Sequence, residues 1–292
     1  MAAAEPGTAS APAAPAASAG GRSNLASRVI VGVFLAVVAI ADIWVGGPVF
    51  TLMIAVAVGL VLWEWCAMHA IPLPWRLAGL AVLAGASALA QAGLVLQALA
   101  LLGAAILIFL PLSALARTAG KRWLSTGLLY AGLPAVALIW LRNQPDGFAL
   151  VMWIMGLVWA TDIFAYFAGR SIGGPKIWPA VSPNKTWAGL LGGMAAAALF
   201  SVVFAGVGDW AQSAITMALV GALLAVVAQA GDFLESWLKR RAGVKDSGTL
   251  LRGHGGVMDR VDGLVPVCVV VALWVGLQTP AQLVLASTEA FA

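Results

Sequence analysis

Apolar runs of membrane-spanning length recur along almost the whole chain. A helix needs about 20 apolar residues to cross about 30 Å of hydrocarbon, and we predict spans at residues 28–45, 48–67, 75–91, 95–113, 123–141, 147–169, 187–207, 211–231 and 263–279. Lipid offers no partner for backbone amides, so such runs must be helices, and the alternating pattern of a membrane barrel is absent. The sequence therefore predicts an all-α, polytopic membrane helix bundle with about nine transmembrane helices.

The basic residues predict the orientation of this bundle. Cytoplasmic loops retain Lys and Arg, and with the N-terminus inside, fifteen of the sixteen fall on the inner side, Arg142 being the exception. We therefore predict a multi-pass protein of the cell membrane with its N-terminus in and its C-terminus out. The formal charge of +4 comes from short membrane-flanking loops, which argues against a nucleic-acid partner.

The composition changes at both ends of the chain and suggests four regions. We predict a disordered Ala/Pro-rich tail at residues 1–24, N-terminal transmembrane helices at 25–150, a C-terminal transmembrane catalytic region at 151–280 and a short tail at 281–292. Cys66 and Cys268 stand alone in apolar surroundings, so we expect small core residues and no disulfide or metal site.

The first of three polar clusters begins inside the sixth predicted helix. Asp162 lies about 12 Å along that helix from Arg170, at a depth where a carboxylate costs about 2.5–3.5 kcal/mol on insertion scales. Tyr166, one turn later, shares its face. Asp162 and Tyr166 are therefore candidate substrate-binding residues. The alternative is a helix-end carboxylate paired with Arg170 or with a neighbouring helix.

An irregular loop rich in Gly and Pro follows and leads into the seventh helix. Ser182, Lys185 and Thr186 stand at the helix start beside unpaired backbone amides, an arrangement that suits a phosphate. Simple capping of the helix by Ser182 or Asn184 is the alternative.

The second polar cluster closes the eighth helix at residues 231–241. Asp232, Glu235, Ser236 and Lys239 recur at spacings of three, four and seven and form one stripe. A solvated helix end with a Glu235–Lys239 pair is the alternative function-free interpretation.

The third cluster, residues 245–263, contains two aspartates three positions apart. Carboxylates about 4 Å apart repel by about 4 kcal/mol at an effective dielectric constant of 20, so Asp259 and Asp262, joined by Asp232 and Asp246, need a cation. Lys245 and Arg260 supply part of that charge. An all-oxygen site favours a hard divalent ion, Mg²⁺ before zinc.

Glycines surround the histidine of this cluster. Gly253, Gly255 and Gly256 allow close backbone approach, and successive amides there can cradle a phosphate. His254 would contact that phosphate or handle a proton, the alternative being an ordinary loop histidine. Carboxylates, cations and a glycine cradle on one predicted cytoplasmic face favour phosphoryl or nucleotidyl transfer between a soluble nucleotide and a lipid.

The same residues resemble the signature of the phosphatidate cytidylyltransferases, also called CDP-diacylglycerol synthases. The positions that match in spacing are Ser236, Lys239, Arg240, Lys245, Asp246, Gly253, His254, Gly255, Gly256, Asp259, Arg260 and Asp262. The resemblance covers roughly residues 155–270 and includes Asp162, Tyr166, Ser182, Lys185, Thr186 and Asp232. The departures are Ile163, Phe164, Ala188 and Arg252.

The resemblance implies transfer of CMP from CTP to phosphatidate, giving CDP-diacylglycerol and pyrophosphate, with Mg²⁺, room for a second cation and a homodimer as the oligomer. On this basis Asp232 and Asp259 would bind the metal, with Asp246 and Asp262 as further ligands. The groups expected to act on the nucleotide phosphates are Lys239, Arg240, Lys245, His254 and Arg260. The remaining substrate-binding candidates are Asp162, Tyr166, Ser182, Lys185, Thr186, Ser236, Gly253, Gly255 and Gly256.

Four other functions fit parts of the pattern. A polyprenol kinase or an archaeal-type lipid cytidylyltransferase would also use CTP, and only the kinase would release CDP. A CDP-alcohol phosphotransferase would have its aspartates four apart, not three. A transporter would carry its polar residues near the bilayer midplane, whereas Asp42, Glu64 and Asp209 fall near predicted helix ends.

Overall fold

The computed structural model describes residues 21–115, 122–208, 210, 212–248 and 255–278. In these ranges the chain is helical apart from short connections, and Lys176 and Thr186 form an isolated antiparallel bridge. The all-α fold is therefore confirmed. The predictions for residues 1–20, Asp209, Arg252, Gly253, His254 and 281–292 fall outside the described residues.

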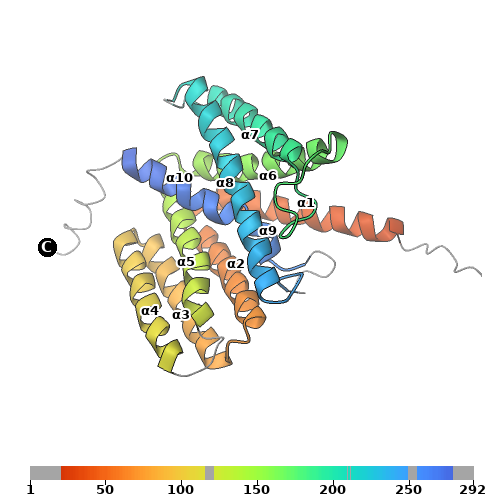
Figure 1. Cartoon of the computed structure of the whole chain (residues 1–292). Helices are drawn as coiled ribbons and strands as arrows, with labels where there is room; N and C mark the ends of the chain where they lie inside the picture. Colours follow the sequence, from red (N-terminus) through yellow and green to blue (C-terminus); the bar gives the residue numbers. More distant parts are fainter. Residues whose placement is uncertain (1–20, 116–121, 209, 211, 249–254, 279–292) are drawn as a thin grey trace, which may run out of the picture. The chain divides into compact units, whose positions relative to one another are not determined.

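Ten helices follow one another in the described part of the chain (Figure 1). They are α1 (Gly21–Val45), α2 (Gly47–Met68), α3 (Leu73–Gln91), α4 (Val95–Leu115), α5 (Arg122–Arg142), α6 (Gly147–Ser171), α7 (Trp187–Val207), α8 (Ala214–Arg241), α9 (Met258–Val261) and α10 (Leu264–Gln278). Helix α1 begins at Gly21, so its first four residues overlap the predicted tail, which ends at residue 24.

Six of the described helices are long and apolar enough to cross a bilayer. They are α2, α3, α6, α7, α8 and, from Trp123, α5. Shorter apolar helical stretches occupy residues 32–45, 95–111 and 264–278. The chain is therefore a multi-pass membrane protein, while the count of nine spans and the orientation of the termini stay predictions.

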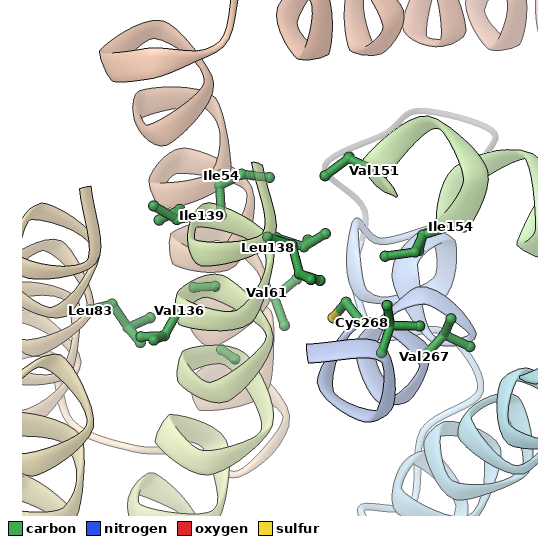
Figure 2. Close-up of a cluster of buried hydrophobic side chains, with 14 of the residues drawn as sticks. Ile54, Val61, Leu83, Val136, Leu138, Ile139, Val151, Ile154, Val267 and Cys268 are labelled. Carbon is green, nitrogen blue, oxygen red and sulfur yellow. The ribbon is translucent and has the colours of Figure 1, made fainter. Parts of the chain in front are cut away.

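Residues 39–292 form one compact unit, separate from residues 1–38. Helix α5 lies at the centre of its core, because it packs on α2, α3 and α4 and also on α6 and α10. Figure 2 shows Val136 of α5 facing Leu83 of α3, and Leu138 lying toward Cys268 of α10. Both cysteines are buried and free, as predicted.

Helices α6, α7 and α8 pack on one another through small residues. A Cβ atom on Gly189 of α7 would lie 2.9 Å from the Ala165 carbonyl oxygen of α6, and one on Gly192 would overlap the Ala168 side chain. On α8, a Cβ on Gly221 would overlap α7 in the same way. These close approaches bring the end of α6 and the start of α7 together.

Candidate active site

A cavity of about 600 Å³ lies where the end of α6, the start of α7, the polar part of α8 and α9 meet. Four carboxylates and three cationic side chains line it together with small and neutral residues. The charged ones are Asp162, Asp232, Asp259, Asp262, Arg170, Lys176 and Lys185. A pocket with both signs of charge can hold a cation and an anion side by side.

The loop between α6 and α7 brings two lysines to this cavity by folding back on itself. The Ile177 N–H donates to the Lys185 carbonyl at 3.1 Å, and the Trp187 N–H donates to the Pro175 carbonyl at 3.1 Å. Gly173 takes a positive φ of 70° just before this pairing, a conformation that favours glycine. Lys176 and Lys185 consequently line the same cavity.

Thr186 caps helix α7. Its side chain accepts a hydrogen bond from the Gly189 N–H at 3.0 Å and is 3% exposed. The helix is therefore capped by a side chain, as the alternative proposed, but the cap is Thr186. Ser182 and Asn184 precede the N-cap position and do not cap the helix. Thr186 also lines the cavity.

Lys185 neutralises one of the aspartates of α8. Its ammonium group forms an ion pair with Asp232 and donates to the Gln229 Oε1 at 3.2 Å. Gln229 is only 4% exposed and lies one turn before Asp232 on the cavity side of α8. The side-chain amide of Gln229 thus helps to position the Lys185 ammonium group beside the Asp232 carboxylate.

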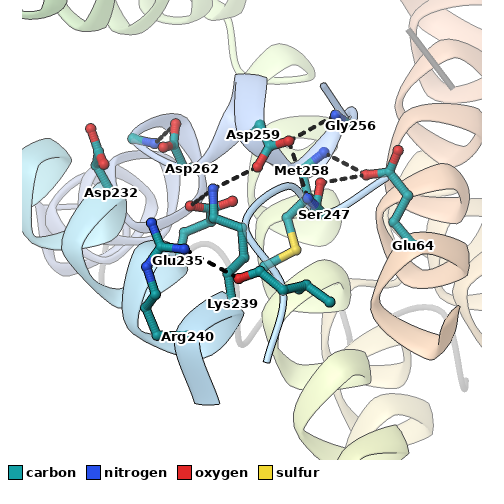
Figure 3. A network of polar contacts seen from close by, with 12 residues as sticks. Glu64, Asp232, Glu235, Lys239, Arg240, Ser247, Gly256, Met258, Asp259 and Asp262 are labelled. Atoms are coloured by element: carbon teal, nitrogen blue, oxygen red, sulfur yellow. Dashed lines mark hydrogen bonds and ion pairs between the residues drawn. The ribbon is translucent and has the colours of Figure 1, made fainter. Parts of the chain in front are cut away.

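Lys239 bridges two further carboxylates (Figure 3). Its Nζ lies 2.7 Å from Glu235 Oε2 and 2.7 Å from Asp259 Oδ1. The Glu235–Lys239 pair of the alternative interpretation is present, but Glu235 is 1% exposed, so this part of the helix is not the solvated end that the alternative assumed. Burial alone would raise the pKa of Asp259, but interactions with the side chains of Glu235 and Lys239 and with the Gly256 N–H hold that pKa well below its usual range.

The surroundings of Asp262 raise its pKa, whereas those of Asp259 lower it. One oxygen accepts the Gly263 N–H at 2.9 Å. Burial and the nearby carboxylates of Asp232 and Asp162 nonetheless raise the pKa of Asp262 to about 7. Figure 3 shows Asp232 and Asp262 as neighbours, so negative charge accumulates at this end of the cavity.

Asp162 and Tyr166 line the cavity from α6, as their common helix face predicted. The alternative interpretation paired Asp162 with Arg170 or with a neighbouring helix, and the structure does not pair it with Arg170. Instead, the Arg170 guanidinium donates to the Tyr166 hydroxyl at 3.4 Å.

Other predicted site residues lie outside this cavity. Those within the described part of the chain are Ser182, Ser236, Lys239, Arg240, Lys245, Asp246, Gly255, Gly256 and Arg260. Lys245 and Asp246 are exposed. Of the predicted metal ligands, Asp232, Asp259 and Asp262 share the cavity and Asp246 does not, and the described residues contain no three-membered cluster of His, Cys, Asp or Glu of coordinating geometry.

Three residues of the site region had no recognised signal in the sequence. Gln229 and Lys176 line the cavity, and Glu64 of α2 binds the segment that carries Asp259. Gln229 follows an apolar run, Lys176 lies in an irregular loop, and Glu64 resembles any charge at a helix end. The spacing of Gln229 three residues before Asp232 was the only available indication.

The fold is a membrane-embedded helix bundle with a cavity that contains both carboxylates and cations, as an enzyme with anionic substrates would need. The cytidylyltransferase family model matches residues 26–277, and the chain belongs to that family.

Several relatives have similar sequences over most of their length. A phosphatidate cytidylyltransferase of Brucella abortus is 42% identical over 258 residues, which cover 83% of this chain and 90% of the relative. One of Pseudomonas aeruginosa is 37% identical over 273 residues, covering 86% and 97%. One of Bacillus subtilis is 38% identical over 144 residues, covering 49% and 54%. The predicted family is therefore confirmed, and it extends into the first half of the chain.

Proposed function

We propose that this protein is a phosphatidate cytidylyltransferase, a transferase of phospholipid biosynthesis that makes CDP-diacylglycerol from CTP and phosphatidate. Family membership supports the reaction, and the observation that carries the site is the cavity with both carboxylates and cations at the ends of α6, α7 and α8. A transporter would not need that charge arrangement at one mouth of the bundle.

The chemistry needs two anions brought together. An oxygen of the phosphatidate phosphate attacks the α-phosphorus of CTP, a new P–O bond forms, and the bond from that phosphorus to the β-phosphate oxygen breaks as pyrophosphate leaves. The attacking oxygen is already anionic, so positioning and charge neutralisation carry most of the catalysis. Lys176, Lys185 and Arg170 are the cavity cations that would hold the phosphates.

Lys185 must change partners when a phosphate enters. It is paired with Asp232 in this structure, and a phosphate can replace that carboxylate as its anion. Lys239, bound to Glu235 and Asp259, would keep the carboxylate of Asp259 ionised. Arg240, Lys245, His254 and Arg260 remain candidates for binding triphosphate from the signature loop.

Mg²⁺ fits the crowded end of the cavity. Asp232 and Asp262 offer oxygen ligands. Burial, and after it the neighbouring carboxylate of Asp232, raises the pKa of Asp262, so a cation beside these oxygens would offset charge that is costly to bury. Mg²⁺ is usually held by one or two carboxylates plus substrate phosphates, so a three-residue cluster is not required. The bound ion would neutralise charge on the phosphates. Asp259 and Asp246 are further candidate ligands, and a second cation is a further candidate cofactor.

The sidedness and oligomeric state are part of the proposal. The basic loops favour a cytoplasmic active site in the cell membrane. A homodimer is supported only by the resemblance, and light scattering of the detergent-solubilised protein would test it.

The activity can be measured directly on purified protein in detergent. With labelled CTP, phosphatidate and Mg²⁺, we expect a lipid-soluble cytidine product and an equal amount of pyrophosphate. Asp232→Asn should lower turnover by about 10²–10³-fold, because it removes charge at the predicted metal site. Asp146→Asn is the matched control, since Asp146 is exposed at the other end of α6 and makes no side-chain cap. Release of CDP in place of pyrophosphate would contradict the proposal and indicate a kinase.

A further inference from the structure

A buried carboxylate in the second helix binds the signature loop from far away in sequence. Glu64 of α2 is 2% exposed. Its Oε1 accepts the Val257 N–H at 2.9 Å, and its Oε2 accepts the Met258 N–H at 3.0 Å and the Ser247 hydroxyl at 3.0 Å. These partners lie 183 to 194 residues further along the chain.

The loop closes tightly around this carboxylate. A Cβ atom on Gly248 would lie 2.7 Å from Glu64 Oε1, and one on Gly256 would overlap both Glu64 Oε2 and the Ser247 hydroxyl. The three donors are neutral groups, two of them backbone amides, so the contact depends on loop geometry and not on an ion pair. A helix-end charge that merely contacts water would not be enclosed in this way.

The same short segment also holds Asp259. The Gly256 N–H donates to Asp259 Oδ2 at 2.7 Å, and the Ser247 N–H donates to the same oxygen at 3.3 Å. Residues 247 and 256–258 therefore lie between two carboxylates, with Glu64 on one side and Asp259 on the other (Figure 3). The other oxygen of Asp259 is bound by Lys239 at 2.7 Å.

We propose that Glu64 is a positioning residue of the active site, which fixes this segment from α2 and thereby sets Asp259 at the edge of the cavity. The inference rests on the proposed function, because it takes Asp259 to act on the substrates or their metal. A displacement of about 1 Å at a reacting group can cost about 10²-fold in rate. Glu64 reaches the substrates only through Asp259.

The central test is Glu64→Gln, which keeps the size of the side chain but replaces one acceptor oxygen by a donor. We expect kcat to fall about 10²-fold while the KM for phosphatidate is unchanged, since the lipid would contact the cavity wall and not Glu64. Hydrogen exchange of the segment 255–262 should become faster, because the amides of Val257 and Met258 bind different oxygens of Glu64 and one of them loses its acceptor.

The matched control is Thr51→Val on the same helix. Thr51 is also buried and donates to Gln91 of α3, remote from the loop. The two variants should lower the thermal midpoint by similar amounts, but only Glu64→Gln should lower kcat and loosen residues 255–262. Equal loss of kcat in both variants would overturn the inference, because it would reduce Glu64 to a packing role.

Ser247→Ala keeps the test decisive should Glu64→Gln fail to fold. It removes one donor to Glu64 and leaves the backbone bond to Asp259 in place, so we expect about a tenfold lower kcat, equivalent to one hydrogen bond. Combined with Glu64→Gln it should add little, since both act through one contact. A Ser247→Ala enzyme with wild-type kcat would count against the inference.

Asp259→Asn separates the inference from the function on which it rests. If Asp259→Asn is inactive and Glu64→Gln is fully active, Glu64 has no positioning role and the proposed site stands. If Asp259→Asn is itself fully active, the assignment of Asp259 fails and the inference fails with it.

Discussion

The aspartates of the cavity differ in what balances their charge. Asp232 is paired with Lys185, and Asp259 is bound by Lys239 and by backbone amides. Asp262 receives a single backbone hydrogen bond from Gly263 and lies near other carboxylates. Free positive charge is therefore most needed beside Asp262, which is why we place the cation there and not among the signature glycines.

A single added methyl group should show how closely the signature loop fits. In Gly256→Ala the new Cβ would overlap Ser247 and Glu64, so the loop must shift, and we expect turnover to fall about 10²-fold. Gly263→Ala is the control in the same segment, because its Cβ would meet Ala228 and Val158 at an ordinary 3.5 Å. The measurement is the steady-state turnover of both variants. Equal turnover would show that the loop can accommodate an added methyl group at residue 256.

The sequence predicted those site residues whose charge is unusual in an apolar chain. Asp162, Lys185, Asp232, Asp259 and Asp262 all line the cavity. Glu64 could not be predicted in the same way, because its partners are backbone amides, which every residue has and which no pattern of side chains marks. Three-dimensional closure of the loop creates that contact.

At the scale of helices, the contact between α6 and α7 determines the shape of the cavity. Gly189, Gly192 and Gly193 of α7 let its backbone approach α6, and a Cβ on Gly193 would lie 3.1 Å from the Thr161 carbonyl oxygen. Small residues at such positions are usual between membrane helices. The cavity residues of α6 and α7 are therefore brought together by glycines that make no contact with substrate.

A larger side chain at the α6–α7 contact should distort the cavity even though it does not line the cavity itself. Gly192→Leu must push α7 away from Ala168 of α6, and overpacking costs about 1–3 kcal/mol. We expect a lower thermal midpoint and weaker CTP binding, measured by the KM for CTP. Gly206→Leu on the same helix is the control, because nothing lies within 4 Å of its added Cβ. Parallel effects in both variants would mean that the leucine itself, and not the helix contact, is responsible.

Hydropathy predicted the helices well, since each of the predicted spans overlaps a helix of the structure. It could not predict which helices pack together, because lipid-facing and buried positions are equally apolar. Helix α8 continues to Arg241, ten residues past the predicted span end at 231. In this extension Asp232 lines the cavity, and Lys239 binds both Glu235 and Asp259, so the polar side chains of the stripe have partners inside the protein.

At the scale of the whole molecule, the predicted orientation can be tested with single cysteines. Ala180 in the α6–α7 loop and Asn143 in the α5–α6 turn are both exposed. An impermeant thiol reagent should label Ala180→Cys only from the cytoplasmic side and Asn143→Cys only from the outside. The native cysteines are fully buried and should contribute little background. Labelling of both variants from one side would contradict the predicted topology.

Because Glu64 accepts hydrogen bonds from Ser247, Val257 and Met258, we expect that this chain cannot be divided into an anchor and a detachable enzyme. The last quarter of the sequence carries the recognisable signature, yet one of its supports comes from the second helix. We expect a hybrid that joins the front of one relative to the back of another to work only where an acidic residue of the second helix still accepts hydrogen bonds from this segment.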